Sequence, residues 1–134
     1  MSSKPELLIA DKAPAAIGPY SLGVRTGHFL FISGTLGIDP AHGDLADGGI
    51  EAETRQALTN LENILQAGGS SLQHVVKTTV FMRDLEEFSR MNEVYASFFS
   101  KDPPARSTVQ VARLPKDAAV EIEAVAVKAV PLGD

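Results

Sequence analysis

The chain has 134 residues, of which 44% are hydrophobic, and it contains no cysteine. This length suits one domain with a buried core, and the lack of thiols excludes disulfides, thiolate catalysis and cysteine-ligated zinc. Lys and Arg number 12 against 17 Asp and Glu, and the formal charge of −5 repels nucleic-acid backbones. We therefore expect a single domain over residues 1–134, with its core at about 13–130, and no nucleic-acid partner.

The first twenty residues contain one apolar run, "LLIA", at residues 7–10. It is too short for a signal-peptide core or a membrane span. We expect a cytoplasmic protein with no membrane partner.

The first predicted elements are a strand pair followed by a helix. His28–Ser33 is a β-type run that ends at Gly34, and we expect its hairpin partner around Tyr20–Val24. Apolar residues then recur at helical spacing over Ile50–Ala67, and two glycines follow as a stop signal. The pattern predicts a helix over those residues.

The second half of the chain predicts a strand, a helix and two more strands. His74–Met82 is rich in β-branched residues, and Asp84 with Glu87 forms a D-x-x-E variant of the capping box before the next helix. Prolines at 103 and 104 prevent that helix from continuing. The order β-β-α-β-α-β-β predicts an α+β fold with one mixed sheet and two helices.

The last predicted strand, "VEIEAVAV" at residues 120–127, has two distinct faces. Because side chains alternate along a strand, one face carries two glutamates and two valines and the other only apolar residues. Two helices cover one face of such a sheet, and a second copy of the chain is the cheapest cover for the other. We expect a homo-oligomer.

Several segments together resemble the RidA/YjgF/UK114 family of reactive-intermediate deaminases over about residues 13–128. They are "APAAIGPY", "VVKTTVFMRDL", "MNEVYASFF" and above all "PPARSTVQVARLPKDAAVEIEAVAV". The resemblance implies a chorismate-mutase-like α+β fold and a homotrimer with its sheets facing the centre and its sites between subunits. It also implies hydrolysis of enamine/imine intermediates such as 2-aminoacrylate, formed by pyridoxal-phosphate enzymes, to 2-ketoacids and ammonia, without a cofactor.

Arg106 is the first candidate site residue. A guanidinium matches a carboxylate in two parallel hydrogen bonds, and the resemblance makes Arg106 the anchor of the substrate carboxylate. From sequence alone, a solvated surface arginine or an intramolecular partner for Glu121 is the simpler interpretation. Arg113, near Lys116 and Asp117, is predicted to be structural.

Glu121 matches the water-orienting glutamate of the family and is the expected general base and acid. Glu123 lies on the same strand face, about 6 to 7 Å away by strand rise, and we favour a structural carboxylate paired across an interface. By resemblance, Tyr20, Ser33 and Gly34 also line the cleft, with Tyr20 contributed by the subunit next to the one that holds Arg106.

Asn92 and Thr108 complete the expected substrate-binding set. Asn92 matches a further cleft position, although its surroundings also resemble an ordinary helix surface. Thr108 stands where many family members have cysteine, and the resemblance implies that the main-chain carbonyl there helps to hold water.

No metal site is expected, because His28, His42 and His74 lack ligand spacing and "DPAHGDLADGG" lacks the acids of a calcium loop. Two other functions stay open. One is a non-catalytic regulatory protein that binds small 2-ketoacids, and the less favoured one is an endoribonuclease or translation inhibitor.

Overall fold

The computed structural model describes residues 4–129, so that residues 1–3 and 130–134 of the expected domain lie outside the described part. Its helices are α1 (Ile50–Ala67) and α2 (Phe88–Phe98). The strands are β1 (Glu6–Leu7), β2 (Gly23–Thr26), β3 (Phe29–Leu36), β4 (Ile38–Asp39), β5 (Asp44–Leu45), β6 (Val75–Met82), β7 (Ala105–Gln110) and β8 (Val120–Val127).

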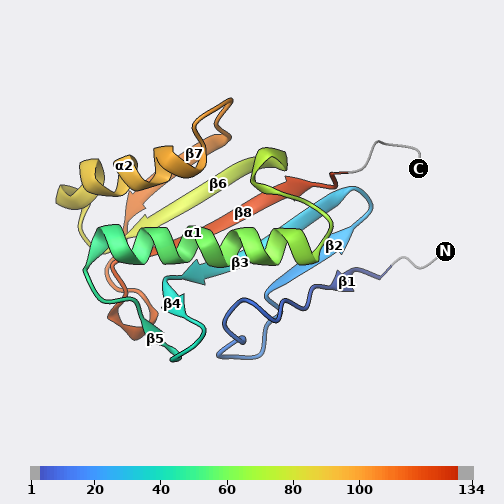
Figure 1. The fold of residues 1–134 in the computed structure, drawn as a ribbon, viewed down its shortest axis with the longest axis horizontal. Coiled ribbons are helices and arrows are strands. Elements are labelled where there is room, and N and C mark those ends of the chain that lie inside the picture. Colours follow the sequence, from blue (N-terminus) through green and yellow to red (C-terminus); the bar gives the residue numbers. More distant parts are fainter. Residues whose placement is uncertain (1–3, 130–134) are drawn as a thin grey trace.

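The main sheet has six strands in the order β1-β2-β3-β8-β6-β7, and β4 and β5 form a separate pair. All neighbours in the main sheet are antiparallel except β6 and β7, which are parallel and joined through α2. Both helices pack on one face of the sheet (Figure 1). The predicted α+β fold, a mixed sheet covered on one side by two helices, is confirmed.

Helix α1 spans the predicted residues and is held to the sheet by fully buried leucines, among them Leu58, Leu61 and Leu65. Glu51 and Glu53 lie in its first turn, where a negative charge stabilises the helix by interacting with the helix dipole. The amide of Gly68 ends the helix on the carbonyl of Ile64. These features fix α1 along the centre of the sheet.

The predicted capping box before the second helix forms only in part. The Asp84 carboxylate accepts from the amide of Glu86, which starts a short 3-10 turn over Leu85–Glu87 ahead of α2. The Glu87 carboxylate binds Arg90 at 2.7 Å instead of reaching back to Asp84. The reciprocal bond predicted from the D-x-x-E pattern is therefore wrong, because an arginine one turn later offers a charged donor.

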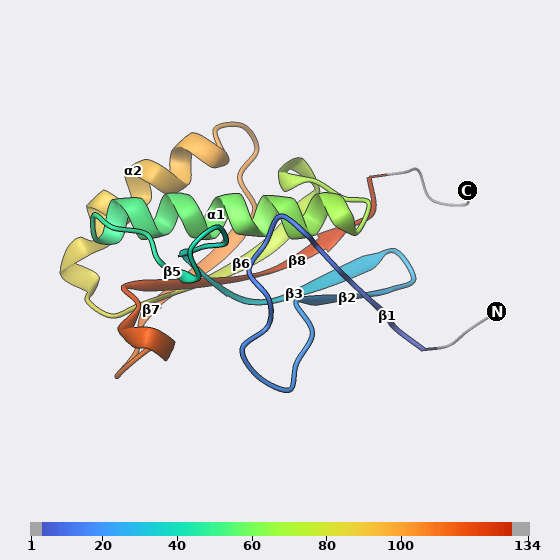
Figure 2. The same cartoon turned by 60° about the horizontal axis from the view of Figure 1, so that its bottom comes forward.

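Strand β8 divides its side chains between the two faces as predicted. Val120, Ile122 and Ala126 are fully buried under the helices, and Glu121 and Glu123 point to the opposite face, which we call the open face. Figure 2 shows α1 and α2 above the sheet, and the loop before β2 and the short 3-10 turn at Pro115–Asp117 below it, so neither α1 nor α2 covers the open face.

Large apolar side chains lie uncovered on the open face. Phe29 and Phe31 of β3 are 48% and 44% exposed, and Val109 of β7 is 42% exposed. The rings of Phe29 and Phe31 lie 6.4 Å apart between centres, and such an exposed apolar pair is suited to contact with another protein chain. Among residues 4–129, no helix combines the length and apolar character needed to cross a membrane.

Candidate active site

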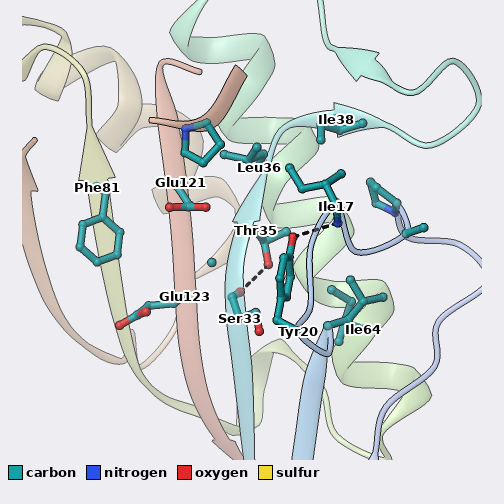
Figure 3. Close-up of a pocket in the computed structure, with 15 residues that line it drawn as sticks. Ile17, Tyr20, Ser33, Thr35, Leu36, Ile38, Ile64, Phe81, Glu121 and Glu123 are labelled. Carbon is teal, nitrogen blue, oxygen red and sulfur yellow. Dashed lines mark hydrogen bonds between the residues drawn. The ribbon is translucent and has the colours of Figure 1, made fainter. Parts of the chain in front are cut away.

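A cavity of about 520 Å³ opens on the open face, between β3, β8 and the loop that precedes β2. Tyr20 closes it from that loop, Ser33 and Gly34 come from β3, and Glu121 comes from β8 (Figure 3). Four of the predicted site residues are therefore brought together in one cavity.

The carboxyl group of Glu121 lies directly against the backbone of β3. A Cβ atom at Gly34 would lie 2.7 Å from Cδ of Glu121, so only glycine leaves room for this carboxylate. The register between β3 and β8 shifts between Ile32 and Thr35, which places Gly34 in a bulge. Bulges of this kind redirect side chains beside functional sites, and here the bulge makes space for an acid.

The pKa of Glu121 is raised above the ordinary value for a glutamate. The main cause is desolvation by burial, and the second is repulsion from the negative charge of Glu123. A raised pKa makes a carboxylate a better proton acceptor near neutral pH. Glu121 is therefore suited to take a proton from water and to return it.

The hydroxyl groups of Tyr20 and Ser33, two of the cavity residues, have partners inside the chain. The Tyr20 hydroxyl accepts a hydrogen bond from the amide of Ile17 at 3.3 Å (Figure 3). The Ser33 hydroxyl donates to the carbonyl of Ser21 at 2.6 Å. The Ser33 proton is thus committed, but its oxygen keeps a lone pair that can accept from a bound molecule or water.

Arg106 lies outside this cavity, on the helix-covered side of the sheet. In the parallel pair of β6 and β7 it stands beside Thr78, which is fully buried beneath α2. Its guanidinium carbon lies 4.7 Å from the ring centre of Tyr95 and 5.5 Å from that of Phe88. Pairing with Glu121 within the chain is therefore wrong, because the sheet separates the two side chains.

A solvated surface arginine is not what the structure has either. Arg106 is partly buried, and within residues 4–129 no carboxylate forms an ion pair with it. Its guanidinium contacts two aromatic rings, and no carboxylate in the described part of the chain neutralises its charge.

Thr108 and Asn92 lie on the same side as Arg106. Thr108 stands beside Val80, whose side chain is in the core, and its buried hydroxyl has no hydrogen-bond partner among the described residues. Asn92 follows Phe88 by four residues on α2 and so shares its face of the helix. We call Arg106, Thr108 and Asn92 the arginine group, as distinct from the cavity group of Tyr20, Ser33, Gly34 and Glu121.

Arg113 is structural, as predicted. Its Nε donates to Oδ1 of Asp117 at 2.6 Å, across the turn that leads into β8. Glu123 is exposed at the edge of the cavity, and its pairing across an interface stays a prediction. In the described part of the chain, no three acidic, histidine or cysteine side chains are grouped as metal ligands would be.

Sequence analysis did not identify several further cavity residues, including Ile17, Leu36, Phe81 and Pro115. It also missed the ring contacts of Arg106, although Phe88 and Tyr95 were visible as apolar residues of the second helix. Parallel pairing of β6 with β7 creates those contacts, and no local signal in either strand specifies its neighbour.

The protein is thus of the α+β class, and its candidate site residues lie on two faces of one sheet. The arginine group is on the helix-covered face, and the cavity group is on the open face. A family model described as Endoribonuclease L-PSP matches residues 10–128. The chain belongs to this family, known also as the RidA/YjgF family, as the resemblance predicted.

Relatives with different names match nearly the whole chain. A 2-iminobutanoate/2-iminopropanoate deaminase of Capra hircus is 50% identical over 96% of this chain and 94% of its own length. A RutC family protein of Pyrococcus horikoshii is 49% identical over 92% of this chain and 98% of its own length. A crystal structure of RidA from an Antarctic Psychrobacter is 43% identical, with a TM-score of 0.88 over 91% of this chain and 98% of the other.

Proposed function

We propose that the protein is a 2-iminobutanoate/2-iminopropanoate deaminase, an enzyme that hydrolyses a C–N bond without a cofactor. The observation that carries the proposal is Glu121, a partly buried carboxyl with a raised pKa that lies in a cavity beside Gly34. Curated mammalian relatives of about 50% identity over most of the chain bear this name, which supports the same reaction here.

The proposed reaction adds water to the carbon of a 2-imino acid. Glu121 takes a proton from the water as the water oxygen bonds to the imine carbon, and gives that proton to the imine nitrogen, which forms a carbinolamine. Glu121 then carries the proton of the new hydroxyl group to the same nitrogen. The C–N bond breaks, the carbonyl of a 2-ketoacid forms, and ammonia leaves. Tyr20 and the oxygen of Ser33, which line the same cavity, are proposed to orient the water or the substrate.

The substrate carboxylate requires a cation, and we propose Arg106 for this role. None of its N–H donors has an acceptor among the described residues, so two of them can be given to a carboxylate in parallel. Asn92 of α2 lies on the same side of the sheet as Arg106. We propose that Asn92 and the main-chain carbonyl of Thr108 complete this half of the site.

We further propose that the complete site lies between subunits of a homotrimer. Within one chain the cavity group and the arginine group are on opposite sides of the sheet, so Arg106 of one subunit has to meet Glu121 of the next. A contact between two different surfaces closes into a ring when its rotation allows. The uncovered apolar open face supports such an interface.

A second candidate is an endoribonuclease, because the matching family model carries that description. The formal charge of −5 opposes it, since phosphate backbones are bound by clusters of basic residues. A non-catalytic protein that binds 2-ketoacids through Arg106 is a third, and it would show ligand binding without turnover.

A competition assay tests the deaminase. A pyridoxal-phosphate dehydratase forms 2-aminoacrylate from serine, semicarbazide traps it, and the rate of semicarbazone formation is recorded with and without this protein. We expect suppression by the wild type and its loss in Arg106→Ala, which removes about 2 to 4 kcal/mol of transition-state stabilisation.

Arg55→Ala is the matched control, because Arg55 is exposed on α1 and belongs to neither residue group. It should suppress as the wild type does. No suppression by the wild type would reject 2-aminoacrylate as the substrate, and equal activity of Arg106→Ala would reject the anchor. RNA cleavage that copurifies with the protein and persists in Arg106→Ala would favour the ribonuclease.

A further inference from the structure

Two aromatic rings hold the guanidinium of Arg106. Its Cζ atom is 4.7 Å from the ring centre of Tyr95 and 5.5 Å from that of Phe88, both within the range of a cation–π interaction. Tyr95 follows Phe88 by seven residues, which is two helical turns, so one face of α2 presents both rings. The two contacts restrict where the guanidinium can lie.

Tyr95 is itself fixed in place. Its side chain is 5% exposed, and its ring packs on that of Phe99 at 4.7 Å between centres. Its hydroxyl shares a 2.7 Å hydrogen bond with the hydroxyl of Thr78, a fully buried residue of β6. Because the Tyr95 ring is already ordered, its contact with the flexible side chain of Arg106 does not require a further loss of conformational entropy by the tyrosine.

These contacts form a closed structural loop. Thr78 is the β6 residue directly beside Arg106 of β7, its side chain bonds Tyr95, and the ring of Tyr95 meets the guanidinium of Arg106. Tyr95 is thus attached to the strand pair that carries Arg106, and its ring contacts the guanidinium of that arginine.

The rings position the cation without neutralising it. Burial raises the pKa of Tyr95, so this residue is an uncharged phenol at neutral pH. An aromatic ring has no lone pair in its plane that would occupy the N–H donors of a guanidinium. A carboxylate in place of the rings would also have fixed Arg106, but it would have competed with an anionic substrate.

We infer that Tyr95 is a positioning residue that, with Phe88, holds the Arg106 guanidinium ready for the carboxylate of a 2-imino acid. The inference rests on the proposed function, in which Arg106 is the anchor. The substrate carboxylate is bound alike in the ground state and the transition state, so loss of the ring should raise KM and leave kcat nearly unchanged.

The test compares Tyr95→Leu, which removes the ring, with Tyr95→Phe and Thr78→Val, which keep it and remove only the hydroxyl contact. For Tyr95→Leu we expect KM for the imine, and Kd for 2-oxobutanoate by calorimetry, to rise about 5- to 30-fold, the range of a cation–π contact. Tyr95→Phe and Thr78→Val should stay within about threefold of the wild type, because the ring remains.

Phe99→Leu controls for lost packing, since Phe99 is equally buried and touches Tyr95 but is not one of the rings that hold Arg106. It should lower the melting temperature as Tyr95→Leu does and leave KM unchanged. In an Arg106→Ala background, Tyr95→Leu should cause no further loss of 2-oxobutanoate affinity, which a purely structural role would not predict.

A Tyr95→Leu variant with wild-type KM and Kd would overturn the inference, as would a Phe99→Leu variant whose KM rises as much. Deaminase activity in the wild type is measured first and separates the two proposals. If the wild type binds 2-oxobutanoate without turnover, the deaminase is rejected and Kd alone decides the role of Tyr95. If it does neither, both are rejected.

Discussion

Arg106 and Glu121 are only two strands apart in one sheet, yet their side chains leave it on opposite faces. Arg106 stands beside Thr78 in β6, whose side chain is buried under the helices. Glu121 stands beside Phe81 of the same strand, which lines the open-face cavity. Because side chains alternate along β6, one chain does not bring both groups to one molecule, and the proposed site would take them from two copies of the chain.

This division predicts complementation between two inactive variants. Arg106→Ala and Glu121→Gln protomers, unfolded together in equal amounts and refolded, should regain about one quarter of wild-type activity, since one site in four then joins an intact arginine to an intact glutamate. Turnover of the mixture, compared with each variant alone, is the measurement.

The control mixes Arg106→Ala with the double variant that carries both substitutions. No site in that mixture contains an intact arginine, so it should stay inactive. If the Arg106→Ala and Glu121→Gln mixture is no more active than its components, a site divided between protomers is contradicted.

The two glutamates of β8 predict the acid limb of the pH profile. Glu121 acts as a base only when ionised, so its raised pKa places the loss of kcat/KM at higher pH than an ordinary glutamate would. Glu123→Gln removes the like charge, lowers the pKa of Glu121 and should move the acid limb to lower pH. The exposed Asp47→Asn is the control for net charge. If the acid limb of the kcat/KM profile is at the same pH in Glu123→Gln and in the wild type, Glu123 does not affect the pKa of Glu121.

Gly34 is predicted to protect the position of the Glu121 carboxyl, which we propose to be catalytic. The methyl group of Gly34→Ala would lie 2.7 Å from Cδ and 2.8 Å from Oε2 of Glu121, so the carboxylate has to move. Because the obstacle is the end of a side chain, the fold should survive while kcat falls by about 10- to 100-fold, the effect of a misplaced catalytic group. Melting temperature and kcat measured together test this, and full activity in a folded variant would refute it.

Glu53 of α1 is predicted to make stability depend on pH. Its buried carboxylate accepts from the amide of Ala119, just before β8, and desolvation raises its pKa. The stability this carboxyl contributes is fully present below its unfolded-state pKa of 4.5 and is lost as the pH rises through the higher folded pKa. Glu53→Gln does not titrate at this position. Its free energy of unfolding, relative to that of the wild type, should therefore increase from pH 4 to pH 7.

Glu53→Leu separates the hydrogen bond from the charge. It leaves the buried amide of Ala119 without an acceptor and should be less stable than Glu53→Gln by about 1 to 3 kcal/mol at both pH values, since neither variant titrates. Denaturant unfolding at pH 4 and pH 7 measures both variants. A constant difference between Glu53→Gln and the wild type would show that Glu53 does not titrate differently on folding.

The elements that could be predicted from sequence are those with a strong local pattern. The bounds of α1 follow from the spacing of its leucines and the glycines after it, and the two faces of β8 follow from strict alternation. Tyr20, Ser33, Gly34 and Glu121 were grouped through a family resemblance, and the cavity brings them together.

Strand neighbours could not be predicted in the same way. The last two strands flank a short turn and read as consecutive, but β6 lies between β7 and β8 because the α2 crossover returns the chain parallel to β6. That placement decides which face Arg106 occupies and which rings it meets. The face of a side chain depends on long-range register, which no short window of sequence contains.

The order of the strands also bears on how the chain folds during synthesis. β8 is the last of the described strands to leave the ribosome, yet it pairs with β3 and β6 in the middle of the sheet (Figure 1). Until it emerges, β3 and β6 each lack a neighbour and the cores beneath both helices stay open. Nascent chains should therefore remain unfolded and in need of protection until translation is nearly complete, and a stop codon before residue 120 should yield aggregates in place of a smaller folded protein.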